Sequence, residues 1–187
     1  MKLLDRYLRN MRIKKAKAFI RNNDSILDIG SADGVMFEKL RTLIGKSAGV
    51  DPTLKEKIEK DLYTLYPGYF PEACPEEGAF NIITMLAVLE HIPTSQQAQM
   101  ALNCHKFLKP KGRLIITVPS PQVDYILDLL LKLKLIDGMS LEEHYGFIPE
   151  HTEQIFTAPF FKLVKKQKFQ FGLNNLFVFE RLESENF

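Results

Sequence analysis

The sequence lacks the features that mark metal sites, export and membrane spans. Its 187 residues include two cysteines, Cys74 and Cys104, which are too far apart for a CxxC pair and form neither a zinc pattern nor a disulfide framework. No apolar run approaches the roughly 20 residues that a transmembrane helix needs. We therefore expect no metal site, no membrane span and a reducing, cytoplasmic location.

The chain also lacks an excess of either charge. Its 25 Lys and Arg residues nearly balance its 23 Asp and Glu residues, for a net charge of +2. A near-neutral chain gives no general case for a nucleic-acid partner. Basic residues interrupt the apolar positions of residues 1–22, so we expect an N-terminal amphipathic helix there and no export signal.

Strands and helices are predicted to alternate along a single domain, residues 1–187. Predicted strands are 25–29, 48–50, the end of 54–61, 80–86 and 113–118. Predicted helices are 3–20, 35–43, 95–108, 123–136 and 157–166, with a loop over 63–78 and a hairpin of 168–173 and 176–181 around Asn174-Asn175. Alternation of this kind is typical of a parallel sheet with helices on both faces.

The most informative stretch is Leu27 to Gly34, where a strand leads through a turn into a helix. Gly30 and Gly34 stand at the two ends of the turn and let the backbone approach a ligand closely. Ligands of such sheets bind beyond the carboxyl ends of the strands. We therefore expect the chemistry just after Ile29, Val50, Leu86 and Val118.

Two nucleotide sites are disfavoured. A dinucleotide fingerprint would need glycine at 32 and glycine or alanine at 35, where the chain has Ala32 and Val35. A P-loop is suggested by 45–47, Gly-Lys-Ser, but Leu40 stands where the upstream glycine is required, and the tripeptide precedes a strand instead of following one.

The pattern Asp28-x-Gly30-x-x-x-Gly34, with Asp51 closing the next strand, resembles the cofactor site of class I S-adenosylmethionine-dependent methyltransferases. Lys60-Asp61-Leu62 is similar to the acidic turn after the third strand of that family. The stretches 80–93, FNIITMLAVLEHIP, and 108–119, LKPKGRLIITVP, resemble the fourth and fifth strands of its small-molecule (methyltransferase type 11-like) branch. The resemblance covers residues 24–181. It implies a Rossmann-like, doubly wound α/β fold, with a mostly parallel seven-stranded sheet and a C-terminal antiparallel hairpin.

The resemblance implies S-adenosyl-L-methionine as cofactor and S-adenosyl-L-homocysteine as product. Asp28 would attract the ammonium group or order the turn, and Asp51 would accept hydrogen bonds from the ribose hydroxyls. Asp61 would accept a hydrogen bond from the adenine amino group. The full set of predicted cofactor-binding residues is Asp28, Gly30, Ser31, Gly34, Asp51, Pro52, Asp61, Leu62, Met85 and Leu86. Taken singly, each aspartate is explained equally well as a turn or loop residue.

Two residues depart from the family pattern. Ala32 replaces the usual middle glycine, and Asn81 replaces the aspartate that usually begins the fourth strand. We expect a structural role for Asn81. These departures keep open the alternative of a protein that binds the cofactor without turnover.

The absence of certain motifs narrows the range of possible methyl acceptors. The Asn/Asp-Pro-Pro-aromatic turn of adenine methylation, the Pro-Cys nucleophile of cytosine methylation and the double-glutamate loop of arginine methylation are not found. We therefore expect a small-molecule acceptor, namely a metabolite, lipid or sugar, with O-methylation favoured and a nucleic acid less favoured.

Methyl transfer mainly requires an aligned nucleophile, and a hydroxyl acceptor can also need a general base. The candidate bases are His91, His144, His151 and Glu150. Residues 123–136 are apolar on more than one helical stripe. This predicts a substrate lid within 120–156 or a peripheral membrane contact, the alternative being packing on the N-terminal helix.

Overall fold

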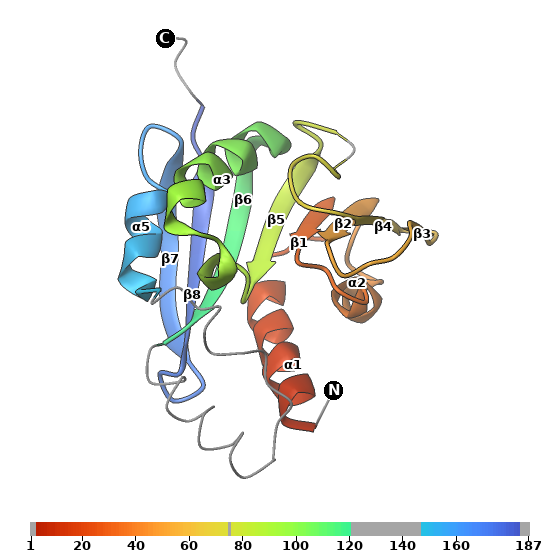
Figure 1. The fold of residues 1–187 in the computed structure, drawn as a ribbon, viewed down its shortest axis with the longest axis horizontal. Helices are drawn as coiled ribbons and strands as arrows, with labels where there is room; N and C mark the ends of the chain where they lie inside the picture. Colours follow the sequence, from red (N-terminus) through yellow and green to blue (C-terminus); the bar gives the residue numbers. More distant parts are fainter. Residues whose placement is uncertain (1–2, 75, 121–146, 184–187) are drawn as a thin grey trace.

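The computed structural model describes residues 3–74, 76–120 and 147–183 (Figure 1). The strands are β1 (Ile26–Ile29), β2 (Ser47–Asp51), β3 (Ile58–Glu59), β4 (Tyr63–Pro67), β5 (Phe80–Leu86), β6 (Leu108–Pro119), β7 (Phe161–Phe169) and β8 (Asn174–Arg181). The α-helices are α1 (Leu3–Lys17), α2 (Val35–Leu40), α3 (Thr94–Phe107) and α5 (Thr152–Ile155). Two short 3-10 helices are η1 (Leu89–His91) and η3 (Pro149–His151).

The strands form one sheet in the order β3-β4-β2-β1-β5-β6-β8-β7. Strands β4, β2, β1, β5 and β6 run parallel, whereas β8 and β7 form an antiparallel hairpin beside β6. This confirms the expected α/β architecture with a mostly parallel sheet. The two-residue strand β3, antiparallel to β4, is an edge addition to the seven expected strands.

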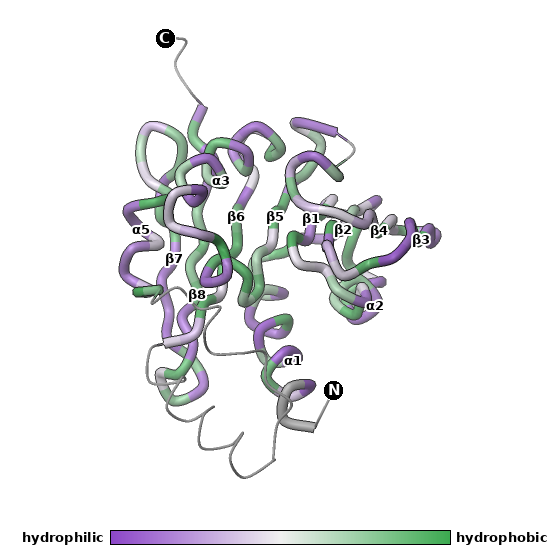
Figure 2. Tube along the Cα trace, in the orientation of Figure 1, coloured by the Kyte–Doolittle hydropathy of each residue, from purple (hydrophilic) through white to green (hydrophobic). Residues whose placement is uncertain are grey.

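Alternate residues of the central strands point to opposite faces of the sheet and contribute to two hydrophobic cores, one on each face. Ile26 and Ile82 face a core that includes residues of α1 and α2, such as Ile13 and Phe37. Their chain neighbours face the opposite core, which is completed by Cys104 and Phe107 of α3 and by Phe156. Because both faces are covered, the central strands are mostly apolar, whereas the outer strands β3 and β7 are largely hydrophilic (Figure 2).

The predicted loop over 63–78 is wrong at its start, because Tyr63–Pro67 is strand β4. Tyr63 and Leu65 are buried while the residues between and after them are partly or fully exposed, so the strand follows the period-two pattern of a half-buried strand. Strand β4 pairs in parallel with β2, with Tyr63 opposite Ser47. The third parallel strand is therefore β4 and not the end of 54–61.

The predicted helix over 157–166 is also wrong. Thr157 to Phe160 form a turn, and the lysine-rich residues that follow form the edge strand β7. The predicted hairpin is confirmed, but its turn lies at 170–173, because Asn174 and Asn175 belong to β8 and pair with Pro119 and Val118. Lysines are common on edge strands, where their charge opposes pairing with another chain.

Part of the predicted lid lies within the structure. Residues 147–156 contain η3 and α5, whereas the apolar segment 123–136 lies outside the described residues. Within the described part of the chain, no helix is long and apolar enough to cross a membrane.

Candidate active site

The carboxyl ends of the three central strands lie level with one another. Ile29 at the end of β1 is opposite both Val50 of β2 and Met85 of β5. The next two backbone N–H groups, of Gly30 and Ser31, both donate to the Val50 carbonyl, at 2.9 and 3.2 Å. The turn of residues 30–34, called the glycine loop below, is thus held against the ends of β1 and β2.

The glycine loop needs backbone conformations that side chains disfavour. Gly30, Ala32 and Gly34 have φ of 78°, 45° and 73°, all in the left-handed region. A Cβ on Gly30 would lie 2.5 Å from Cγ2 of Val88, which follows β5. Ala32 adopts the left-handed region at a cost of about 1–2 kcal/mol relative to glycine, which explains why glycine is usual at this position.

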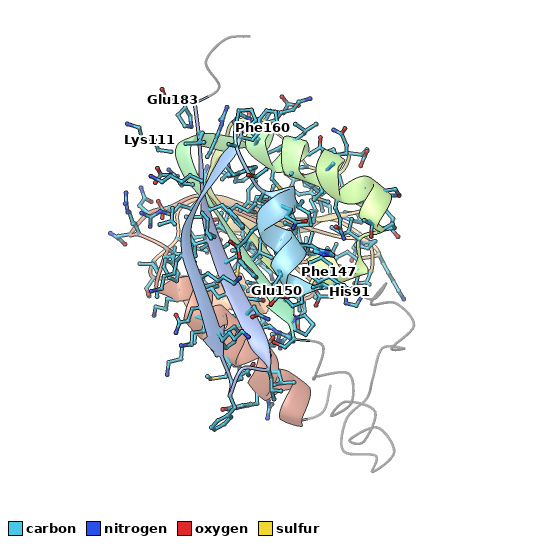
Figure 3. All side chains as sticks on the ribbon, turned by 90° about the vertical axis from the view of Figure 1, so that its left-hand side faces the viewer. His91, Lys111, Phe147, Glu150, Phe160 and Glu183 are labelled. Carbon is cyan, nitrogen blue, oxygen red and sulfur yellow. The ribbon has the colours of Figure 1, made fainter. Side chains whose placement is uncertain are left out.

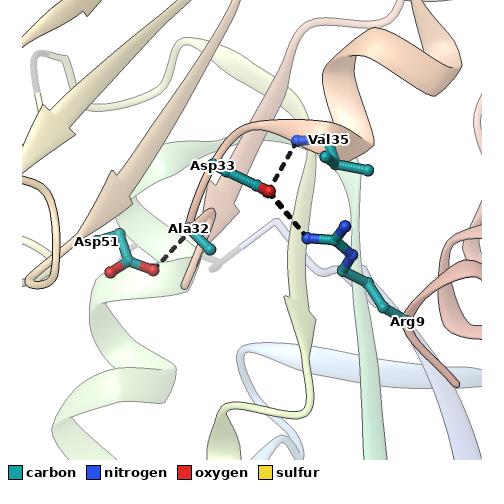
Figure 4. A network of polar contacts seen from close by, with 5 residues as sticks. All are labelled: Arg9, Ala32, Asp33, Val35 and Asp51. Atoms are coloured by element: carbon teal, nitrogen blue, oxygen red, sulfur yellow. Dashed lines mark hydrogen bonds and ion pairs between the residues drawn. The ribbon is translucent and has the colours of Figure 1, made fainter. Parts of the chain in front are cut away.

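Asp51 links the end of β2 to the glycine loop (Figure 4). The residue is 6% exposed, and its Oδ2 accepts a hydrogen bond from the Ala32 N–H at 2.7 Å. Its Oδ1 accepts from the backbone N–H and the hydroxyl of Thr53, at 2.8 and 2.5 Å. A carboxylate has about four acceptor positions, so Asp51 retains capacity for a ligand hydroxyl.

Asp28 lies beneath the same loop, on β1. Its Oδ1 accepts a hydrogen bond from the Thr84 hydroxyl of β5 at 2.6 Å, and the residue is 5% exposed. Burial raises the pKa of Asp28 to about 7; the Thr84 hydrogen bond opposes this rise and the negative charge of Asp51 adds to it. A cation entering the site would therefore favour the charged form of Asp28.

Ser31 contributes a buried hydroxyl to the loop. The residue is 5% exposed, and its Oγ has no hydrogen-bond partner among the described residues. A buried polar group in this state costs free energy unless a ligand or water satisfies it. The Ser31 hydroxyl is thus a ready contact for a polar ligand.

The structure brings together most of the predicted cofactor residues. Gly30, Ser31 and Gly34 belong to the glycine loop, and Asp28 and Asp51 lie next to it. The remaining members of the group, Pro52, Met85 and Leu86, lie at the ends of β2 and β5.

Asp61 and Leu62 are not part of this group, which corrects the prediction. They precede β4 and therefore lie at the amino edge of the sheet, opposite the glycine loop. The Asp61 side chain is 84% exposed, and its Oδ2 is 2.9 Å from Nη2 of Arg41. The error follows from the misplaced third strand, because a residue after a short strand at 54–61 would have been at the carboxyl edge.

The candidate bases are spread over two segments. His91 is half-buried in η1, directly after β5, whereas Glu150 and His151 are exposed in η3. Figure 3 shows His91, Phe147 and Glu150 toward the same side of the molecule. His144 lies outside the described residues.

Several residues of the site were missed by sequence reasoning. Thr84 was detectable as a polar residue inside an apolar strand, and its hydroxyl holds Asp28. Arg9 of α1 bonds Asp33 of the glycine loop at 2.9 Å (Figure 4), a contact that no local pattern indicates. The expected structural role of Asn81 is confirmed, because its Oδ1 accepts from the backbone N–H and the hydroxyl of Ser25.

Comparison with known proteins agrees with this geometry. A family model described as a methyltransferase domain matches residues 3–164. The ubiquinone biosynthesis O-methyltransferase of Nitrosococcus oceani is 30% identical over 115 residues, which are 53% of this chain and 47% of that protein. A Paraburkholderia xenovorans protein of the same name is 28% identical over 97 residues, 47% of this chain and 41% of that one. The chain spans about half the length of these curated relatives.

Solved structures share the whole fold at low identity. The N-methyltransferase NodS from Bradyrhizobium japonicum has a TM-score of 0.69 at 16% identity, over 97% of this chain and 100% of that chain. The Burkholderia thailandensis 1,6-didemethyltoxoflavin-N1-methyltransferase, solved with S-adenosylhomocysteine, has a TM-score of 0.67 at 16% identity, over 92% and 79%.

The chain belongs to the methyltransferase-domain family, since the family match covers most of its length. More particularly, it is an S-adenosylmethionine-dependent methyltransferase with the class I α/β fold.

The glycine loop fits S-adenosylmethionine on three observations. The Ser31 hydroxyl lacks a protein partner among the described residues, Gly30 has no room for a Cβ, and Asp51 has acceptor capacity left. These features suit a ligand with an ammonium group and adjacent hydroxyls that approaches the backbone closely. A dinucleotide-binding fingerprint would have its third glycine at position 35, where this chain has Val35. The substitution has no consequence for S-adenosylmethionine, since this cofactor carries no phosphate.

Proposed function

We propose that this chain, as a single domain, transfers the methyl group of S-adenosylmethionine to a hydroxyl of a small molecule. The observation that carries the proposal is the glycine loop held against Asp51 at the carboxyl ends of β1 and β2. The choice of oxygen follows the relatives named as ubiquinone biosynthesis O-methyltransferases. The acceptor is a metabolite, a lipid or a sugar.

The cofactor-binding roles in this proposal follow the contacts of each residue. Asp51 accepts from a ribose hydroxyl with its remaining acceptor position, while its bond to the Ala32 N–H keeps the loop closed. Asp28 faces the ammonium group or orders the turn beneath it, and Ser31 supplies a hydroxyl contact. The ends of β2 and β5 add the remaining contacts, from Pro52, Met85 and Leu86.

S-adenosylmethionine, when bound, supplies a methyl group already activated by its sulfonium. The protein must then align the acceptor and exclude water, which supplies roughly 7–11 kcal/mol of the barrier in well-oriented reactions. A hydroxyl acceptor also gives up a proton. His91 is the first candidate to receive it, because η1 follows β5 directly and Val88 of the same turn packs against Gly30. His151 and His144 are the alternatives.

Binding without turnover is the second candidate function, and one observation favours it: Ala32 holds a strained conformation where glycine is usual. The other departure, Asn81, does not support it, because that residue is engaged with Ser25 at the amino edge of the sheet.

We further propose a cytoplasmic location and peripheral contact with a membrane, in preference to a nucleic acid. Both cysteines are free thiols, as a reducing compartment requires, and burial raises the pKa of Cys74 to about 11. The membrane contact is supported by the uneven charge of a near-neutral chain. Residues 3–21 hold seven of its 25 basic residues and one acid.

The experiment is a calorimetric titration with S-adenosylmethionine and S-adenosylhomocysteine, with a nicotinamide dinucleotide as control. Binding of the two sulfur ligands alone is expected, followed by methyl transfer from labelled cofactor to members of a panel of phenols, catechols, sugars and amines. Binding without any product would favour the non-catalytic alternative. No binding by folded, cofactor-free protein would overturn the proposal.

A further inference from the structure

The turn between β7 and β8 presents an aromatic side chain that packing does not explain. Phe171, at its tip, has a relative exposure of 106% and a φ of 56°. A positive φ is a genuine outlier for a bulky residue, and such strain concentrates at functional sites. The Phe171 ring is therefore fully exposed to solvent, and its backbone adopts a disfavoured conformation, although the ring contributes nothing to the core.

The turn is firmly anchored at the carboxyl edge of the sheet. The Ser120 hydroxyl, just after β6, donates to the Gly172 carbonyl at 2.6 Å and accepts from the Asn175 side chain at 2.9 Å. The Ser120 N–H donates to the Leu173 carbonyl. Because β6 ends where β8 begins, the tip projects from the same edge as the glycine loop.

Basic side chains surround the base of this turn. Residues 161–175 contain four lysines and no acid, and Lys165 and Lys168 of β7 are exposed. Helix α1 adds its own charges next to the residues that flank the turn: Arg12 Nε lies 3.3 Å from the Asn174 side-chain oxygen, and Lys15 Nζ lies 5.9 Å from the centre of the Phe169 ring. Edge-strand lysines guard against pairing with another chain, but that role does not account for Phe171.

We propose that Phe171, together with Lys165 and Lys168 of β7 and with Arg12 and Lys15 of α1, forms a docking surface for an anionic lipid bilayer. The phenyl ring would enter the interfacial layer while the lysines contact lipid headgroups, the combination typical of interfacial anchors. A single exposed apolar side chain surrounded by basic side chains suits a bilayer better than a nucleic acid. A nucleic-acid site would need several aromatic side chains for base stacking, or a groove. The inference rests on the proposed membrane contact and does not depend on methyl transfer. It would place the glycine-loop edge of the sheet toward a lipid-borne acceptor.

The test is flotation of the full chain with phosphatidylcholine vesicles, with and without phosphatidylglycerol. Wild-type protein is expected to float with the anionic vesicles at low salt and to be released as salt screens the charges. Phe171→Asn is expected to weaken binding roughly tenfold or more, since burial of the ring is lost. It should keep or raise the melting temperature, because asparagine tolerates a positive φ. Lys165→Glu with Lys168→Glu is expected to weaken binding about twentyfold or more.

Two matched controls are exposed residues elsewhere on the molecule. Tyr69→Asn removes another exposed aromatic side chain, 73% exposed and following β4 on the far side of the sheet. Lys111→Glu reverses an exposed charge at the opposite end of the molecule from the turn (Figure 3). Both should bind like wild type.

Equal binding by Phe171→Asn and wild type, or no flotation with anionic vesicles at low salt, would overturn the inference. A concentration-dependent dimer that Phe171→Asn abolishes would do the same, by assigning the ring to a second copy. Titration of each variant with S-adenosylmethionine keeps the two proposals separate. Cofactor binding that persists without flotation rejects only the docking surface, whereas flotation without cofactor binding rejects only the proposed methyl transfer.

Discussion

The two edges of the parallel sheet each carry an Arg–Asp ion pair. At the carboxyl edge Arg9 of α1 bonds Asp33 of the glycine loop, and at the amino edge Arg41 after α2 bonds Asp61 before β4, both at 2.9 Å. The side chains of the first pair are 27% and 58% exposed, and those of the second are 57% and 84% exposed. The first pair joins a helix to the glycine loop, whereas the second joins two exposed connections.

Two aspartates show the same contrast. Asp51 is buried and accepts three hydrogen bonds at the end of β2. Asp61 is exposed to solvent and accepts a hydrogen bond from the long, exposed side chain of Arg41. Both were predicted to contact the cofactor. The comparison teaches that the direction of the neighbouring strand, and not the residue type, decides which acid lies at the carboxyl edge, where ligands of this fold bind.

The largest difference between the edges is expected for the two aspartates. Asp51→Asn should weaken S-adenosylmethionine binding roughly 100-fold or more, because charged hydrogen bonds are each worth about 1.5–3 kcal/mol. Asp61→Asn should leave the affinity within about twofold of wild type. Calorimetric titration of both variants measures the contrast. An equal loss in both would mean that the carboxyl edge is not the cofactor site.

Sequence reasoning succeeded where a strand is buried on both faces. The apolar runs of β1, β2, β5 and the second half of β6 read directly as strands, and their order located the glycine loop. It failed at the outer strands. The alternation of β4 ends at Pro67 and leads into a stretch with further prolines at 71 and 75, which is typical of a loop. The lysines of β7 suit a helix surface as well as a sheet edge. Only pairing with a neighbouring strand therefore decides the structure of these segments.

The candidate site shows the same division. Gly30, Gly34 and Asp51 belong to one local pattern and were found from it. The Thr84–Asp28 bond and the Arg9–Asp33 pair join segments far apart in the chain. No local pattern reports which residues face each other across strands or between a helix and a loop.

Buried Asp28 gives the carboxyl edge a pH dependence that its removal should abolish. Its pKa is raised from 3.8 to about 7 on folding, so between these values the folded protein keeps a proton that the unfolded chain has lost. The free energy of unfolding should therefore fall as pH rises through this window, by roughly 1.4 kcal/mol per pH unit, and level off above it. Denaturant unfolding across the window should show this slope in wild type and lose it in Asp28→Asn. The same slope in both proteins would assign it to other groups.

Glycines with positive φ allow a smaller but cleaner comparison. Gly30 and Gly78 have φ of 78° and 67°, and an added Cβ would lie 2.5 Å from Val88 at Gly30 but meets nothing within 4 Å at Gly78. Gly78→Ala should therefore cost about 1–2 kcal/mol for backbone strain alone, whereas Gly30→Ala should cost about 2–4 kcal/mol because a clash is added. Thermal or denaturant unfolding of the two variants measures the difference. Equal costs would show that Val88 moves aside without penalty.

The smallest expected effect separates the two ion pairs. A double-mutant cycle with Arg9→Met and Asp33→Asn should give a coupling of about 0.5–1 kcal/mol, and the same changes at Arg41 and Asp61 about 0–0.5 kcal/mol, because the second pair is more exposed to solvent. Arg9→Met should also weaken S-adenosylmethionine binding a few-fold, since Arg9 braces the glycine loop through Asp33, whereas Arg41→Met should not. If both arginine variants bind the cofactor like wild type while the couplings differ, α1 stabilises the fold without ordering the loop, and the functional contrast between the two edges rests on Asp51 and the glycines.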